Sequence, residues 1–261
     1  MGNDEASGIV MIAERRREME WKDYAAEISA VLGLAGSPIA ITYSMEPPAA
    51  AAAGRHRVCE AFLKAREGET IDLTAESSSC RGGSWHLGLA ERPKGEGDKA
   101  LKEFLVKGEK LFCSVTVFHR AQYLCAAPPF GLAEHVVLSP MQKAEFEPDV
   151  VLFICNPLQA CRLVTLDNYA TGIPPKLEMC GSTCHQAVAY PVVTGELNVS
   201  LMDYTSRRMS GYKADELLVS IPYHRFIGVM RSLDKCTAGR AKFEVPESLR
   251  RLGGRGPSPE V

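Results

Sequence analysis

Nine cysteines are the residues of this chain best suited to chemistry. Thiolates act as nucleophiles and as ligands for soft metals such as zinc and iron in clusters. No two of them form a C-x-x-C pair, so zinc ribbons and bacterial ferredoxin runs lack support. The closest local pair is Cys180 with Cys184, which His185 follows directly.

Cys80 lies in the most informative stretch, which reads TAESSSCRGGSWH. The three serines supply hydroxyls that can donate hydrogen bonds to a thiolate or to cluster sulfurs. Gly82 and Gly83 allow the backbone to approach a ligand closely. A helix that begins near Cys80, together with Arg81, would depress the thiol pKa and suit a ligand or a nucleophile. The competing interpretation is a buried residue beside a tight turn.

Two further cysteines stand at predicted helix starts. Cys59 follows the basic residues Arg55, His56 and Arg57, and Cys184 precedes His185. Taken alone, Cys59 would more often be a small core residue, and for Cys184 the two interpretations are evenly balanced. Core packing is expected for Cys113, Cys125, Cys155 and Cys161, and no special role for Cys236.

Two polar positions could hold an anion. The continuous apolar run 150–154 is typical of a strand covered on both faces, and Asn156 follows it at the start of a helix. A helix N-terminus at the end of a strand favours anionic ligands. Arg207 follows another strand, 198–201, and could also bind an anion. Asp203, in the same loop, could ligate a metal or cap a helix, although a solvated turn explains both residues equally well.

The periodicity of apolar residues predicts the elements that must position these side chains. Expected helices are 21–34, 58–65, 98–106 with Asp98 as N-cap, 158–169, 182–189 and 223–233. Expected strands are 39–43, 70–74, 135–139, 150–154, 176–179, 198–201 and 217–221. The span 110–130 has no clear pattern. The sequence thus predicts one α/β or α+β domain over residues 21–235, with helices packed on a mixed sheet. Residues 1–20 are expected to be flexible, and 236–261 to form a disordered tail.

Composition and the absence of common motifs exclude several classes of function for this chain. With 46% hydrophobic and 24% charged residues and a net charge of −2, the chain is an ordinary folded protein without a basic surface for nucleic acid. It has no apolar run long enough for a membrane span, and its N-terminus lacks the order of a secretory signal, so we expect a cytoplasmic protein. The usual motifs of dinucleotide enzymes, P-loop NTPases, zincins and α/β-hydrolases are absent.

Several short motifs in order resemble one family. The motifs are SPIAI from Ser37, RVCEA from Arg57, LTAESSSCRGG from Leu73, NPLQA from Asn156 and NVSL from Asn198. Together with Cys184 and the AVAYP that follows it, they resemble the prokaryotic family known as domain of unknown function 169, over roughly residues 27–235.

The resemblance implies that Cys59, Cys80 and Cys184 act together. The family pattern has cysteines at these positions and often a fourth in the loop after NVSL, where this chain has Asp203. It also often has a proline where this chain has Arg81. A [4Fe–4S] cluster could be held by three thiolates and a carboxylate. It could also be held by three thiolates alone, with the fourth iron open to substrate.

Three hypotheses follow. The first is an iron–sulfur protein, with zinc as a variant, that performs redox or Lewis-acid chemistry on a small anionic molecule held by Asn156 and Arg207. The second is a metal-free enzyme with Cys80 as nucleophile and His86 or His185 as base. The third is a non-catalytic ligand-binding or partner-binding module whose cysteines are core. The expected partners are the small anionic molecule or a redox protein, without nucleic acid or membrane, and the chain could also assemble with copies of itself.

Overall fold

A computed structural model describes residues 21–179 and 181–248. The strands form one six-stranded sheet in the order β2-β3-β1-β4-β6-β5, and each recorded pairing is antiparallel. Their bounds are β1 Ile39–Ser44, β2 Ile71–Leu73, β3 His135–Pro140, β4 Val150–Cys155, β5 Asn198–Ser200 and β6 Leu217–Pro222. The predicted fold class, a single domain of helices packed on a sheet, is confirmed, although the strand pairings are antiparallel and not mixed.

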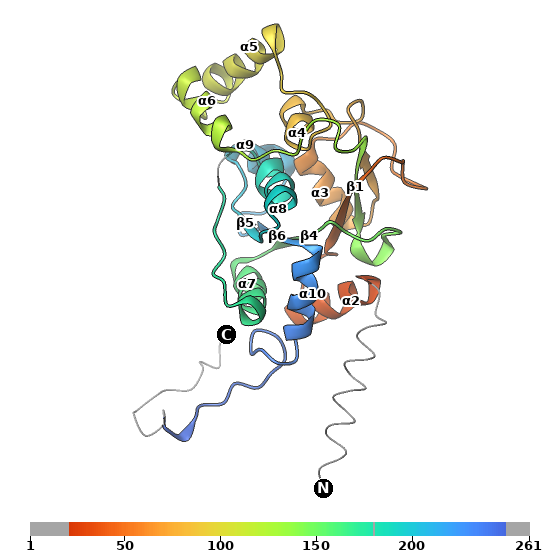
Figure 1. Cartoon of the computed structure of the whole chain (residues 1–261), viewed down its shortest axis with the longest axis vertical. Coiled ribbons are helices and arrows are strands. Elements are labelled where there is room, and N and C mark those ends of the chain that lie inside the picture. Colours follow the sequence, from red (N-terminus) through yellow and green to blue (C-terminus); the bar gives the residue numbers. More distant parts are fainter. Residues whose placement is uncertain (1–20, 180, 249–261) are drawn as a thin grey trace.

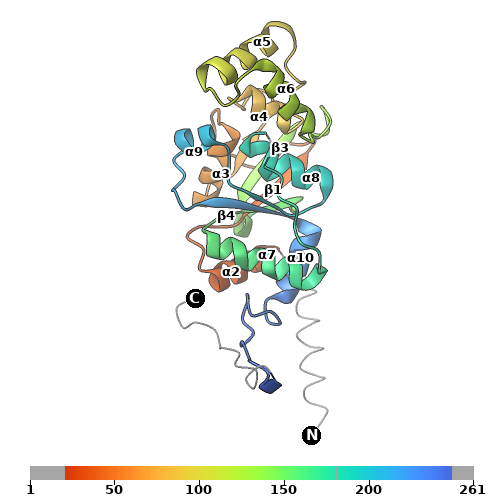
Figure 2. The same cartoon turned by 90° about the vertical axis from the view of Figure 1, so that its left-hand side faces the viewer.

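The helices form layers on both sides of this sheet (Figure 1). Their bounds are α2 Trp21–Leu32, α3 Val58–Glu67, α4 Arg81–His86, α5 Gly95–Glu103, α6 Val115–Leu124, α7 Pro157–Thr171, α8 Tyr190–Thr194, α9 Tyr204–Ser210 and α10 Tyr223–Ser232. Three short helical turns are η1 Phe104–Gly108, η2 Met141–Lys143 and η3 His185–Ala189. Helices α2, α7 and α10 lie against one face, called the α7 face below. Helices α3, α4, α8 and α9 lie on the opposite face, the α3 face (Figure 2).

The strand sequences explain why both faces are covered. In β4 all six residues are buried, and they alternate between two separate cores. Val151 and Phe153 belong to the core of the α7 face, whereas Leu152 and Ile154 belong to that of the α3 face. This alternation is the two-residue period of a strand, and it confirms the expected strand with two buried faces.

An excursion of the chain places two helices beyond the α3 face. Residues 91–127, called the outer segment below, contain α5, η1 and α6 (Figure 2). The chain returns close to where it left, because the backbone N–H of Gly131 donates to the carbonyl of Gly88 at 3.1 Å. Gly88 has φ +74°, and a side chain there would lie 2.8 Å from the Pro129 carbonyl oxygen. The chain therefore leaves for the outer segment and returns from it close to Gly88.

Some local predictions are wrong. Residues 176–179 form no strand, because the backbone N–H and C=O of Glu178 pair with the side-chain amide of Asn198 instead of a neighbouring strand. Asp98 is not an N-cap: α5 begins at Gly95, so Asp98 lies inside the helix, where it pairs with Lys102. The span 110–130, for which no element was expected, contains α6.

The chain beyond position 235 begins as part of the folded domain. Cys236 is buried in the core of the α7 face, rather than lying in a tail. Arg162 of α7 donates hydrogen bonds to the carbonyls of Ala238 and Gly239. The expected flexible segment 1–20 and the end of the expected tail, 249–261, lie outside the described residues. Within the described ranges, no helix is both long enough and apolar enough to cross a bilayer.

Candidate functional site

A cavity of about 340 Å³ lies between the α3 face and the outer segment. Its lining includes Cys59, Cys80 and Cys184. They come from the second residue of α3, the residue before α4 and the residue before η3. Three thiols that are far apart in the sequence thus open onto one space, together with Asp203.

Each of the three sulfurs has a hydrogen-bond partner. Ser210 Oγ donates to Cys59 Sγ at 3.2 Å, and the backbone N–H of Gly83 donates to Cys80 Sγ at 3.3 Å. Ser182 Oγ lies 2.9 Å from Cys184 Sγ, with either atom as the donor. Donors directed at sulfur stabilise thiolates and tune the potential of cluster sulfurs.

Close packing of α4 on α3 positions Cys80. Cys80 is the N-cap residue of α4, and its sulfur accepts a hydrogen bond from the backbone N–H of Gly83. This N–H lies in the first turn, where backbone donors have no partner within the helix. A side chain at Gly83 would come within 2.8 Å of Val58 Cγ2, so only glycine fits between the helices. By contrast, a side chain at Gly82 would meet no atom within 4 Å.

The thiol pKa values differ from the sequence expectation. Burial, and less strongly the charge of Cys59, raises the pKa of the Cys80 thiol, although the N–H of Gly83 and Arg57 act in the opposite direction. Burial, followed by the neighbouring Cys80, raises the pKa of Cys184 well above its usual value. The expected depression at Cys80 is therefore wrong, because desolvation outweighs the short α4 helix.

Asp203 lines the cavity, and hydrogen bonds engage both oxygens of its carboxylate. Its Oδ1 accepts from the N–H of Ser206 at 2.8 Å, which makes it the N-cap of α9. Its Oδ2 accepts from the Ser206 hydroxyl and from both the N–H and the hydroxyl of Thr183. Burial alone would raise the pKa of Asp203, but these bonds lower it. Asp203 therefore joins α9 to the segment before Cys184.

The two residues expected to hold an anion lie elsewhere. Asn156 caps α7 in a reciprocal capping box with Gln159. Arg207 donates to the carbonyls of Leu201, Lys213, Ala214 and Glu216, which ties down the loop after α9. Neither residue is among those recorded as lining the thiol cavity within the described ranges.

Two buried histidines lie next to the thiols. His86 lines the cavity, and its ring centroid is 5.5 Å from that of His185. Burial, and then His185, lower the pKa of His86 to about 3. His86 is therefore neutral at pH 7 and a weak base. Its Nδ1 is buried without a hydrogen-bond partner among the described residues.

The outer segment contributes lining residues that the sequence did not reveal. Phe118 and Gln122 face the cavity from the span 110–130, which had no predicted element, and Glu109 faces it from just before that span. Arg57, which the sequence marked only as part of a basic cluster, lines it from the start of α3. Phe118 and Gln122 are the two buried residues of α6, and their spacing of one helical turn was the available signal.

The remaining cysteines divide between core and surface. Cys155 is buried in the core of the α7 face, as expected, and burial raises its pKa to about 12. Cys125 is half-buried. Cys113 and Cys161 are exposed, so the expectation of core packing is wrong for them. Cys180 lies outside the described residues.

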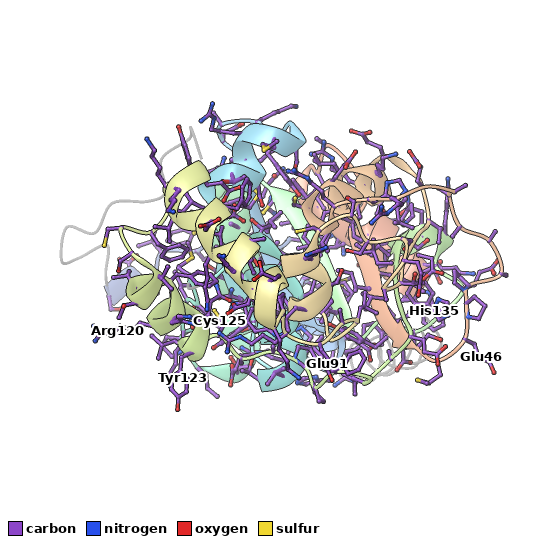
Figure 3. The ribbon with its side chains drawn as sticks, turned by 90° about the horizontal axis from the view of Figure 1, so that it is seen from above. Glu46, Glu91, Arg120, Tyr123, Cys125 and His135 are labelled. Atoms are coloured by element: carbon purple, nitrogen blue, oxygen red, sulfur yellow. The ribbon has the colours of Figure 1, made fainter. Side chains whose placement is uncertain are left out.

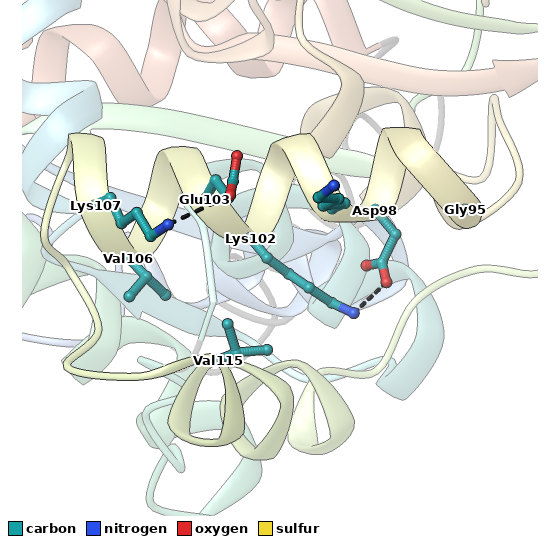
Figure 4. Close-up of a pocket in the computed structure, with 8 residues that line it drawn as sticks. Gly95, Asp98, Lys102, Glu103, Val106, Lys107 and Val115 are labelled. Atoms are coloured by element: carbon teal, nitrogen blue, oxygen red, sulfur yellow. Dashed lines mark hydrogen bonds and ion pairs between the residues drawn. The ribbon is translucent and has the colours of Figure 1, made fainter.

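A second hollow, of about 290 Å³, lies between α5 and α6 (Figure 4). The ion pairs of Lys102 with Asp98 and of Lys107 with Glu103 lie along it. Because its charged groups already pair with each other one turn apart on the helix, this hollow is explained as structure of the outer segment.

No group of three or more His, Cys, Asp or Glu side chains in the described part of the chain is arranged to hold a metal ion. The three thiols share a cavity but do not converge on a single point in the manner of a zinc site. The thiolates that hold an iron–sulfur cluster bind separate irons, and the three thiols of this cavity are soft donors that come from three separate places in the chain.

The fold and the cavity define a structural class: a domain of helices on an antiparallel sheet, with a thiol-lined cavity between the α3 face and the outer segment. The sequence profile of the domain of unknown function 169, described as uncharacterised ArCR, matches residues 27–232. The chain therefore belongs to this family, as the motifs indicated. An uncharacterized protein of Methanocaldococcus jannaschii is 28% identical over 187 residues, which cover 68% of this chain and 76% of that protein. The search of solved structures gave no match.

Proposed function

We propose that this chain is a cytoplasmic iron–sulfur protein that binds a [4Fe–4S] cluster through Cys59, Cys80 and Cys184. The observation that carries the proposal is that these three thiols line one cavity, although 21 and 104 positions separate them in the sequence. The hydrogen-bond partner of each sulfur adds support.

The chemistry proposed is redox or Lewis-acid chemistry on a small anionic molecule. A cluster with three protein thiolates has one iron open to a ligand, and such an iron polarises the bound molecule. Asp203 would not be a ligand of this iron, because its carboxylate is engaged at Ser206 and Thr183. Arg57 and Arg81 line the cavity, so these two cations take the anion-binding role that the sequence suggested for Asn156 and Arg207.

The metal-free alternatives have less support. A nucleophilic cysteine needs a depressed pKa, whereas the pKa of Cys80 is raised by burial. His86, with a pKa of about 3, is a poor base for it. If the cysteines were only core residues, all three would not be expected to line one cavity together with Arg57 and Glu109. The zinc variant is less favoured because no metal-ion geometry exists among the described residues.

The test is anaerobic purification with absorbance between about 300 and 600 nm and iron and zinc assays on the same sample. We expect a broad absorption in the visible range and about 4 Fe per chain. Colourless protein without iron after anaerobic reconstitution would overturn the proposal, and stoichiometric zinc would replace it with the zinc variant.

Single substitutions then identify the ligands. Cys59→Ala, Cys80→Ala and Cys184→Ala should each abolish or strongly reduce iron content while the far-UV spectrum stays folded. Cys155→Ala is the matched buried control and Cys161→Ala the exposed one, and both should retain full iron. Asp203→Asn should retain iron but lose stability. Equal iron loss in the controls would contradict the assignment.

A further inference from the structure

We infer that the thiol cavity binds a small carboxylate with an apolar body, such as an arylalkanoic acid, and that Arg57 binds the carboxylate. The inference deepens the proposed function and rests on it, since the carboxylate end would lie beside the thiols. Three features of the cavity support it: an incompletely paired guanidinium, an apolar wall opposite it, and a volume that suits a molecule of this size.

Arg57 is half-buried and lines the cavity. Its guanidinium has five N–H donors. Among the described residues, its recorded hydrogen bond goes to the thioether of Met209, at 3.5 Å, and a thioether is a weak acceptor. Cys80 and Glu109, which both line the cavity, lie within its electrostatic reach. A planar bidentate acceptor such as a carboxylate matches these free donors.

The outer segment provides an apolar wall opposite the thiols. Its lining side chains are Leu101, Phe104, Leu105, Leu111, Phe112 and Phe118. Phe112 and Phe118 meet edge to face with ring centroids 5.5 Å apart. Phe104 is 52% exposed, so this wall has aromatic surface left for a ligand to cover. A cavity of about 340 Å³ is within the usual range for small-molecule sites.

The other charged groups of the cavity determine where a carboxylate can bind. Asp203 is fully engaged in hydrogen bonds, and Glu109 faces Arg57 from the outer segment. Burial raises the pKa of Glu109, although a hydrogen bond from Thr205 lowers it. Glu109 opposes an incoming anion, so its removal should strengthen carboxylate binding. Arg81 is exposed at the rim and contributes general attraction.

The experiment is calorimetric titration of phenylacetate into the protein, with Trp85 fluorescence as a reporter of location. Trp85 lines the cavity, and Trp21, the second tryptophan, is replaced in a Trp21→Phe background. We expect saturable binding that changes Trp85 emission. Phenylacetamide, which lacks the charge, and acetate, which lacks the apolar body, should each bind at least about tenfold more weakly.

Substitutions at two charges give opposite expectations. Arg57→Gln should weaken phenylacetate binding about tenfold or more, and Arg57→Lys less, because the charge remains without the planar pair of donors. Glu109→Gln should tighten binding. Arg120→Gln is the matched control: it makes the same charge change on α6 at the outer edge of the molecule (Figure 3), and should have no effect.

Titrations of cluster-free and iron-loaded protein separate this inference from the proposed function. Binding that depends on Arg57 in iron-free protein supports the inference even if no cluster forms. Three outcomes would overturn it: no binding up to about 10 mM, equal affinity for phenylacetamide, or unchanged affinity in a folded Arg57→Gln variant. Loss of binding on iron loading would overturn the placement of the carboxylate beside the thiols.

Discussion

At the scale of single residues, the site consists of soft donors held by polar partners. Asp203 is the residue whose interpretation changes most between the sequence and the structure. The sequence suggested a metal ligand or a cap, and the carboxylate makes hydrogen bonds to Ser206 and Thr183. It stands after Met202, a buried non-glycine residue with φ 63°. Such a conformation persists only where surrounding contacts hold it.

We expect Asp203→Ala to lower the free energy of unfolding by about 2 kcal/mol at pH 7, because a cap and charged hydrogen bonds are lost. The folded-state pKa of Asp203 lies below the ordinary pKa of an aspartate. The carboxylate therefore stabilises the fold fully at a pH above the ordinary pKa, and this stabilisation is lost as the pH falls through the folded-state pKa. Urea unfolding should therefore show a difference from the native chain at pH 7 that shrinks as the pH falls below about 4, the ordinary pKa of an aspartate.

Asp98→Ala is the control for this comparison. Asp98 pairs with Lys102 one turn along α5, and such a pair contributes about 0.5 kcal/mol or less. A loss at Asp203 no larger than that at Asp98, or one that stays constant down to pH 2, would contradict the role assigned to its carboxylate.

At the scale of elements, the outer segment is an addition to a complete domain. α5 contributes no buried side chain, and the two ends of the segment meet near Gly88. Its clearest contribution is the apolar wall over the thiols. The core of the α3 face is built from α3, the strands and η3, without side chains of α5 or α6.

Replacing residues 92–126 with a short Gly–Ser linker should leave the domain folded, with a change in the free energy of unfolding below about 2 kcal/mol. Cys59 and Cys80 should then react faster with a thiol reagent, because their cover is removed, while the rate at Cys155 stays unchanged. Mass-spectrometric mapping of the labelled cysteines measures this. A truncated chain without a cooperative unfolding transition would show that the outer segment is part of the core.

At the scale of the whole molecule, the sheet separates the helices of the α7 face from the layer that contains the thiol cavity. On the α7 face, Arg225 of α10 pairs with the buried Asp167 of α7 and with the exposed Glu196. This ion pair holds α10 to α7 beneath the sheet. The thiol cavity lies on the opposite side, above the α3 face.

Arg225→Ala should lower the free energy of unfolding by about 3–5 kcal/mol, because it leaves Asp167 buried without its cation. Glu196→Ala, which removes the exposed partner, should cost about 1 kcal/mol or less. Thermal or urea unfolding provides the measurement. Iron content per folded chain should be equal in both variants and the native protein, and a selective loss of iron in folded Arg225→Ala would show that the two layers are coupled.

The sequence alone determined the elements with strong local signals. The apolar run of β4 and the Asn156–Pro157 helix start were predicted because burial on both faces and capping leave local patterns. The motifs also identified the family. The tertiary structure decided what depends on long-range contacts: that the three thiols share a cavity, that Arg207 and Asn156 lie outside it, and that Arg57 and Glu109 face each other across it. Spacing along a chain does not determine such pairings, because they depend on how the sheet and its helices pack.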